Sequence, residues 1–191
     1  MVLVTQFIDM DYEFFEKLSK SEANAYFQLF LETESSKIKA TIKKCAADGI
    51  KMDFSLKSLP PFIRWVLKRM VTIPLKPDPS APEWIRSNEV YNKRLFEFDD
   101  ASNELILEAA YYLGECFMRT HSSLTWDLGD IKTAEGNMPV IAGFEHGLEM
   151  APILVMSNLL RGVTAEPKKI GDIEIMVDSW NKYVQVFDEP N

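Results

Sequence analysis

One segment, residues 101–120, constrains the fold of this chain more than any other. Its apolar residues recur at helical spacing, and further apolar residues beside them widen the stripe until little of the helix can face solvent. The stripe consists of Leu105, Ile106, Ala109, Ala110, Tyr112, Leu113, Cys116 and Phe117. Asp99 or Asp100 is suited to cap the first turn. We therefore expect a central helix with the other elements packed around it.

The periodicity changes directly after this helix. Residues 124–128 alternate in the manner of a strand, Gly136-Asn137 is a turn signal, and residues 139–144 form a short apolar run with β-branched residues. This pattern predicts a small antiparallel hairpin, about 124–144, laid against the central helix. Gly114, inside that helix, costs about 1 kcal/mol relative to alanine, which predicts close approach of another backbone.

Helices are also expected before the centre. Ser19 and Glu22 have the spacing of a capping box, which predicts a long helix to about residue 47, after a short helix at 11–18. Pro60 and Pro61 fit the first turn of a helix at 59–71. Four prolines within residues 73–82 predict an extended crossover without regular structure.

The remaining segments complete the expected fold. Ser80 and Glu83 repeat the capping-box spacing and predict a helix that continues through Tyr91. Pro152 fits the first turn of a helix at about 151–160, with Gly162 at its end. Residues 172–187 suit a final helix, although their first residues also suit a strand. We expect one predominantly helical α+β domain over all 191 residues.

Targeting signals, metal motifs and cofactor motifs are not recognisable in the chain. The N-terminus lacks a basic leader, and no stretch approaches the roughly 18 apolar residues that span a bilayer. A cytoplasmic protein without membrane contact or cofactor is therefore expected. Cys45 and Cys116 lie within helical patterns, and neither has a cysteine or histidine at metal-binding spacing. We expect both to be buried, reduced thiols.

The charge is distributed unevenly along the chain. Residues 1–100 carry 15 Lys/Arg and 15 Asp/Glu, whereas residues 101–191 carry 6 and 14, so the net charge of −8 arises entirely in the second half. Such a surface would repel a nucleic acid and would favour a basic protein partner. Solubility is the alternative explanation for the same excess of acid.

The acidic side chains around the predicted hairpin form the candidate partner-binding face, and Trp126 lies close to them in sequence. They are either a docking face for a basic protein or a solvated rim without a partner. The full set of candidate residues is Trp126, Asp127, Asp130, Glu135, Glu145 and Glu149.

A second candidate site is a pocket beside the hairpin that contains Glu115, His121 and His146. Glu115 would act there as a buried general base, and the three together could bind a small ligand or a metal. Simpler explanations exist for two of them, because Glu115 is spaced to pair with Arg119 along the helix and His121 is placed to interact with the end of the helix. No nucleophile motif surrounds Cys116 or the serines that follow it, so catalysis is not expected.

Several short motifs in the second half resemble those of a group of uncharacterised bacterial proteins found near secreted polymorphic toxins. They are residues 110–117 (AYYLGECF), 121–126 (HSSLTW), 137–140 (NMPV) with Gly143-Phe144, and 150–153 (MAPI). Members of that group are suspected immunity proteins, which bind and block a cognate toxin in the producing cell. The resemblance covers residues 101–165 well and the first half loosely, and it implies function by stoichiometric binding. A small-ligand-binding protein or enzyme, and a structural subunit with a large apolar patch, are the alternatives.

Overall fold

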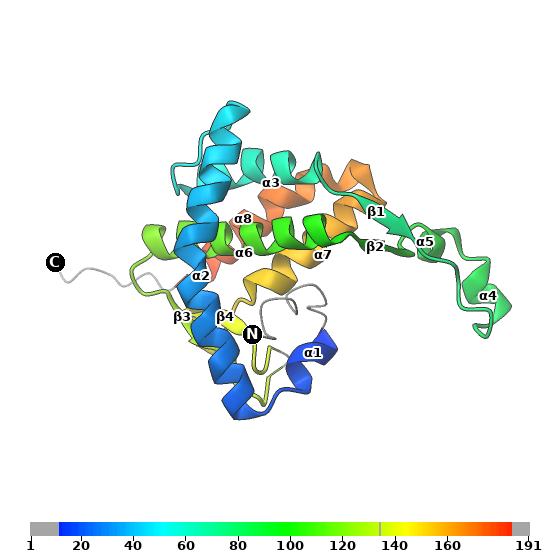
Figure 1. The fold of residues 1–191 in the computed structure, drawn as a ribbon, viewed down its shortest axis with the longest axis horizontal. Helices are drawn as coiled ribbons and strands as arrows, with labels where there is room; N and C mark the ends of the chain where they lie inside the picture. The colour runs from blue at the N-terminus through cyan, green and yellow to red at the C-terminus, as the bar shows by residue number, and fades with distance from the viewer. Residues whose placement is uncertain (1–11, 134, 185–191) are drawn as a thin grey trace.

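The computed structural model describes residues 12–133 and 135–184, and its centre is α6 (Asp100–Thr120). This helix contacts α2 (Lys20–Ala47), α3 (Leu59–Leu67) and α7 (Pro152–Ala165), which surround it (Figure 1). The Asp99 side chain accepts a hydrogen bond from the Ser102 amide and caps the first turn. The predicted central helix and its cap are therefore confirmed.

Two adjacent tyrosines of α6 connect it to different neighbours. Both rings are fully buried. The Tyr111 hydroxyl donates to the Phe30 carbonyl oxygen of α2 at 2.8 Å, and the Tyr112 hydroxyl lies 2.6 Å from Ser58 Oγ, just before α3. Burying a ring of this size contributes about 2 to 3 kcal/mol only when its polar end is also hydrogen-bonded, as it is here. The position of α6 between α2 and α3 is thus fixed on both sides.

The other expected helices are present, with corrected ends. The short helix α1 (Tyr12–Glu16) precedes α2, whose capping box of Ser19 and Glu22 is complete. The 3-10 helix η2 (Leu56–Ser58) leads into α3, which ends four residues earlier than predicted. α7 continues through Gly162 to Ala165, because Gly162 does not adopt the left-handed conformation of a helix end and Val163 beyond it packs in the buried interior. After η4 (Pro167–Gly171), the open choice at 172–187 is resolved as helix α8 (Asp172–Lys182), and residues 185–187 lie outside the described part.

The proline-rich segment forms part of a protruding arm, which we define as residues 75–95 (Figure 1). Its root is an antiparallel ribbon of β1 (Thr72–Pro74) and β2 (Phe96–Phe98), so the prediction of no regular structure at 73–82 is wrong at its start. A proline is compatible with this ribbon because β1 is an edge strand. The predicted helix through Tyr91 is divided into α4 (Glu83–Arg86) and α5 (Glu89–Asn92). Ser80 caps neither helix, because its hydroxyl and amide both donate to Asp78.

The predicted hairpin is confirmed. β3 (Thr125–Leu128) pairs with β4 (Pro139–Ala142), with Trp126 opposite Ile141, and β3 also contacts α2. A bridge between Ile141 and Met150 extends the pairing beyond η3 (Glu145–Gly147). The fold is thus predominantly helical α+β, as expected. Within residues 12–133 and 135–184, no helix has the length and apolar character needed to cross a bilayer.

Candidate protein-binding face

Trp126 fixes the hairpin to the helical body. Its ring lies over Gly114 of α6, where an added Cβ would be only 2.3 Å from Trp126 Cζ2. The close approach predicted at Gly114 is therefore real, but it is made by a side chain and not by a backbone. Trp126 Nε1 also donates to Glu34 Oε1 of α2 at 3.0 Å. The indole is directed into the fold, and its role in partner binding stays a prediction.

The carboxyl group of Glu34 has an unusual protonation equilibrium. Burial raises its pKa to about 7, and the neighbouring carboxylate of Glu115 adds to the rise. The hydrogen bond from Trp126 and the charge of Arg119 oppose it. The contact that docks β3 onto α2 is consequently sensitive to pH near neutrality.

The loop between β3 and β4 is held tightly. An added Cβ at Gly129 would lie 2.2 Å from the Glu135 carbonyl oxygen, so only glycine fits there. Asn137 has a φ of 63°, and its Nδ2 donates to the carbonyl oxygens of Phe15 and Leu18, each at 3.1 Å. These bonds attach the loop to the segment that leads into α2. The backbone at Gly129 and at Asn137 is therefore held in place.

Four of the predicted carboxylates lie close together on this hairpin. Burial raises the pKa of Glu149, and the charges of Asp127, Glu135 and Asp130 add to the rise, while the Asp130 backbone amide opposes it by hydrogen bonding. Glu149 Oε2 is buried and has no hydrogen-bond partner in the described part of the chain. Asp127, Asp130 and Glu135 therefore disfavour the charged form of Glu149, and a cation brought beside Glu149 would be stabilised.

Two apolar side chains accompany these carboxylates. Ile131, in the loop, is 68% exposed, and Leu148, next to Glu149, is 40% exposed. Exposed aliphatic groups surrounded by charge are common at protein-binding sites. We call Asp127, Asp130, Ile131, Glu135, Leu148 and Glu149 the acidic hairpin face.

Glu145, also predicted for this face, lies at the start of η3 and is not among the charges that raise the pKa of Glu149. Its backbone amide donates to the Tyr183 carbonyl oxygen at 2.8 Å, which places it beside the end of α8. The structure thus brings three of the predicted acids, Asp127, Asp130 and Glu135, within electrostatic reach of Glu149, and Glu145 is not among them.

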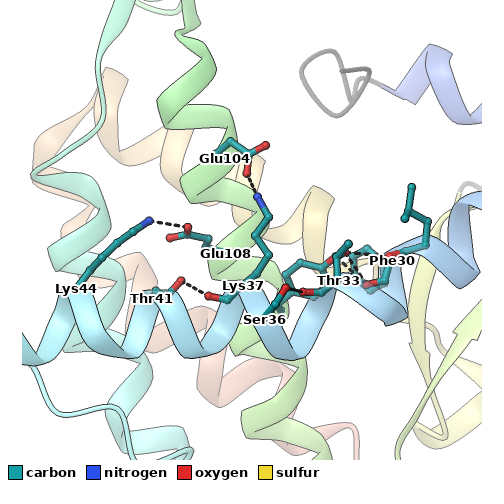
Figure 2. A network of polar contacts seen from close by, with 10 residues as sticks. Phe30, Thr33, Ser36, Lys37, Thr41, Lys44, Glu104 and Glu108 are labelled. Carbon is teal, nitrogen blue, oxygen red and sulfur yellow. Dashed lines mark hydrogen bonds and ion pairs between the residues drawn. The ribbon is translucent and has the colours of Figure 1, made fainter. Parts of the chain in front are cut away.

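Elsewhere the acids of the second half are largely neutralised. Lys37 and Lys44 of α2 pair with Glu104 and Glu108 of α6, as Figure 2 shows, and Arg64 pairs with Glu174. No such ion pair reaches the carboxylates of the acidic hairpin face from any Lys or Arg that the structure describes. Cations from the first half of the chain therefore pair with acids of α6 and α8, whereas the acids of the acidic hairpin face have no such pair among the described residues.

The alternative pocket residues have other contacts. Glu115 pairs with Arg119 Nη2 at 2.6 Å, His121 Nε2 lies 2.8 Å from Asn181 Oδ1, and His146 is exposed with a φ of 58°. Among residues 12–133 and 135–184, no group of three or more His, Cys, Asp or Glu side chains is arranged to hold a metal ion. Cys45 and Cys116 are buried free thiols, as expected, and burial raises the pKa of Cys45 to about 11 and that of Cys116 to about 12.

Sequence reasoning missed the two apolar members of the face, because a single isoleucine or leucine in a loop carries no periodic signal of its exposure. It also missed the exposed apolar side chains of the arm, among which Trp84 is 71% exposed. The helix expected through Trp84 would have buried one side, whereas α4 is only four residues long and buries none.

The chain was compared with family models, with curated proteins and with solved structures, and none of the three comparisons finds a match.

Proposed function

We propose that this protein is an immunity protein that binds and neutralises a cognate bacterial toxin in the cytoplasm, one molecule to one. The observation that carries the proposal is the acidic hairpin face, where Asp127, Asp130 and Glu135 act on the pKa of Glu149 and exposed Ile131 and Leu148 are their neighbours in sequence. None of these four acids has an ion pair with a described Lys or Arg. The resemblance to suspected immunity proteins adds the class of partner. The proposed mechanism is occlusion, without chemical turnover.

The charge of the face suits a partner with a cationic surface. Lys or Arg side chains of the partner would relieve the repulsion around Glu149, so binding would lower its raised pKa and release part of a bound proton. The carboxylates would accelerate encounter, and the two aliphatic side chains would contribute to the lifetime of the complex once water is excluded. The contacts that hold Gly129 and Asn137 in place lower the conformational entropy lost on binding.

The experiment is co-expression with the toxin encoded beside the gene, with cell growth and co-purification as readouts. Wild type should restore growth and form a 1:1 complex. A variant with Asp127→Asn, Asp130→Asn, Glu135→Gln and Glu149→Gln should do neither, because it keeps the shapes of the side chains but loses their charge.

The matched control removes four exposed carboxylates from other surfaces and therefore has the same net charge. It carries Glu83→Gln, Glu89→Gln, Glu97→Gln and Asp178→Asn, and it should protect like wild type. Protection by the hairpin variant, or equal loss in both variants, would show that this face is not the binding site.

A further inference from the structure

The root of the arm carries a cluster of cations in a chain whose net charge is −8. A cavity of about 340 Å³ there is lined by Arg94, Arg161, Lys169 and Asp172, together with Asn158, Leu159 and Gly162. These residues come from the turn before β2, from α7, from η4 and from the start of α8. A second cavity close to it, of about 480 Å³, has Lys93, Lys168 and Glu166 on its wall. The two cavities together present five cations and two carboxylates.

Glu166 forms ion pairs with two of these cations. Its Oε1 lies 3.0 Å from Arg94 Nη2 and 3.0 Å from Lys169 Nζ, and the hydrogen bonds from Lys169 and Arg94 hold the pKa of Glu166 below its usual value. One carboxylate oxygen thus connects the arm to η4. It also marks a position at which the fold already places a negatively charged oxygen between two cations.

Arg161 has no carboxylate partner among the residues that the structure describes. Its Nη1 donates to the Phe96 carbonyl oxygen at 2.6 Å, and its guanidinium carbon lies 5.1 Å from the Phe96 ring and 5.3 Å from the Phe98 ring. These contacts hold the side chain half-buried against β2 without neutralising it. Its other N–H donors make no hydrogen bond with the described residues and are available to a planar or tetrahedral anion.

We propose that this pocket binds the phosphate or diphosphate group of a small anionic ligand. The guanidinium groups of Arg94 and Arg161 would each provide paired donors, Lys169 would add a point charge, and the volume is at the lower end of small-molecule pockets. The bound anion would compete with Glu166 for Arg94 and Lys169. Because Arg94 belongs to the arm and the other two cations to the body, the ligand would also bridge the two.

Isothermal titration with inorganic diphosphate, at ionic strength held constant with sodium chloride, tests the site. Wild type should show saturable binding at one site. The double variant Arg94→Gln/Lys169→Gln should bind at least about tenfold more weakly, since it loses two charge-assisted contacts. Lys39→Gln/Lys43→Gln, which removes two exposed cations of α2 that have no ion pair in the described chain, should bind like wild type.

Glu166→Gln should change the affinity for diphosphate in the opposite direction. Removal of the competing carboxylate should tighten diphosphate binding severalfold, whereas a purely structural ion-pair cluster would gain no affinity for an anion. Parallel titrations with inorganic phosphate and with ADP show what the pocket recognises. If it recognises the anion alone, ADP and diphosphate should bind with equal affinity. If it recognises a nucleotide, ADP should bind more tightly than diphosphate. Absence of saturable binding to wild type, equal weakening in the α2 control, or unchanged affinity in Glu166→Gln would overturn the proposal.

Discussion

Replacement of Gly114 by alanine should destabilise the protein even though alanine is the better helix former. The added methyl group would lie 2.3 Å from Trp126 Cζ2 and 2.6 Å from its Cη2, so the indole must move. Overpacking of this kind costs about 1 to 3 kcal/mol, and displacement of the indole also loses its hydrogen bond to the charged form of Glu34, worth about 1.5 kcal/mol. The higher helix propensity of alanine offsets about 1 kcal/mol of this cost. The net expectation is a loss of about 1.5 to 3.5 kcal/mol.

The assay is urea unfolding at pH 8, with Gly162→Ala as the matched control. Gly162 lies inside α7, and an added Cβ there meets nothing within 4 Å, so the same substitution should stabilise by about 0.5 to 1 kcal/mol. In a Trp126→Ala background, Gly114→Ala should lose its penalty. If Gly114→Ala stabilises the wild-type protein as Gly162→Ala does, Trp126 does not fix the hairpin as described.

Three further predictions concern the supports of α6 and the hairpin. Because the pKa of Glu34 is raised to about 7, its contribution to stability is fully present below about pH 4.5 and is lost as pH rises through 7. Glu34→Gln should therefore gain about 1 to 2 kcal/mol over wild type between pH 5 and pH 8, after allowance for solvent screening, and parallel pH profiles in urea unfolding would contradict this. Tyr112→Phe should cost about 1 to 2 kcal/mol in the same assay, because the Phe54 amide loses its acceptor and the Ser58 hydroxyl loses one of its two partners, and an unchanged midpoint would show that these bonds are dispensable. Lys44→Met should cost about 2 kcal/mol by leaving the buried Glu108 carboxylate without its cation, which thermal unfolding would reveal, and a neutral result would mean that solvent compensates that charge.

Elements with local signals could be predicted from the sequence. The capping box of Ser19 and Glu22 located the start of α2, and the wide apolar stripe identified α6 as the buried centre. The change from helical to alternating periodicity located β3 and β4. In each case the determining residues lie within a few positions of one another, so no tertiary information was needed.

Elements that depend on distant partners were assigned incorrectly. β1 is a strand because Thr72 pairs with Phe98, far along the chain, and the proline-rich sequence around it gave no sign of this pairing. Ser80 has the spacing of a capping residue, but Asp78 is closer and takes its donors. Gly162 resembles a helix end, yet packing carries α7 past it. Tertiary contacts outweighed local preference at Thr72 and Gly162, whereas at Ser80 one local hydrogen-bonding pattern replaced another.

The candidate site was predictable only in part for the same reason. The sequence shows that the second half is acidic, but it does not show that Lys37, Lys44 and Arg64 fold back onto three of its glutamates. Those pairs are the reason why the acids of α6 and α8 differ from the unpaired acids of the hairpin face. The pocket of Arg94, Arg161 and Lys169 was likewise invisible, because its cations lie on separate elements.

The central claim is that the acidic hairpin face meets a cationic protein, and the association rate with the purified toxin, measured by stopped flow as salt is raised, tests it most directly. The rate for wild type should fall about tenfold or more between roughly 50 and roughly 500 mM salt. The variant with Asp127, Asp130, Glu135 and Glu149 neutralised should start slow and respond little to salt, while the charge-matched control with substitutions on the arm, β2 and α8 should keep the wild-type dependence. An association rate that is independent of salt in wild type, or equally dependent in all three proteins, would contradict the claim.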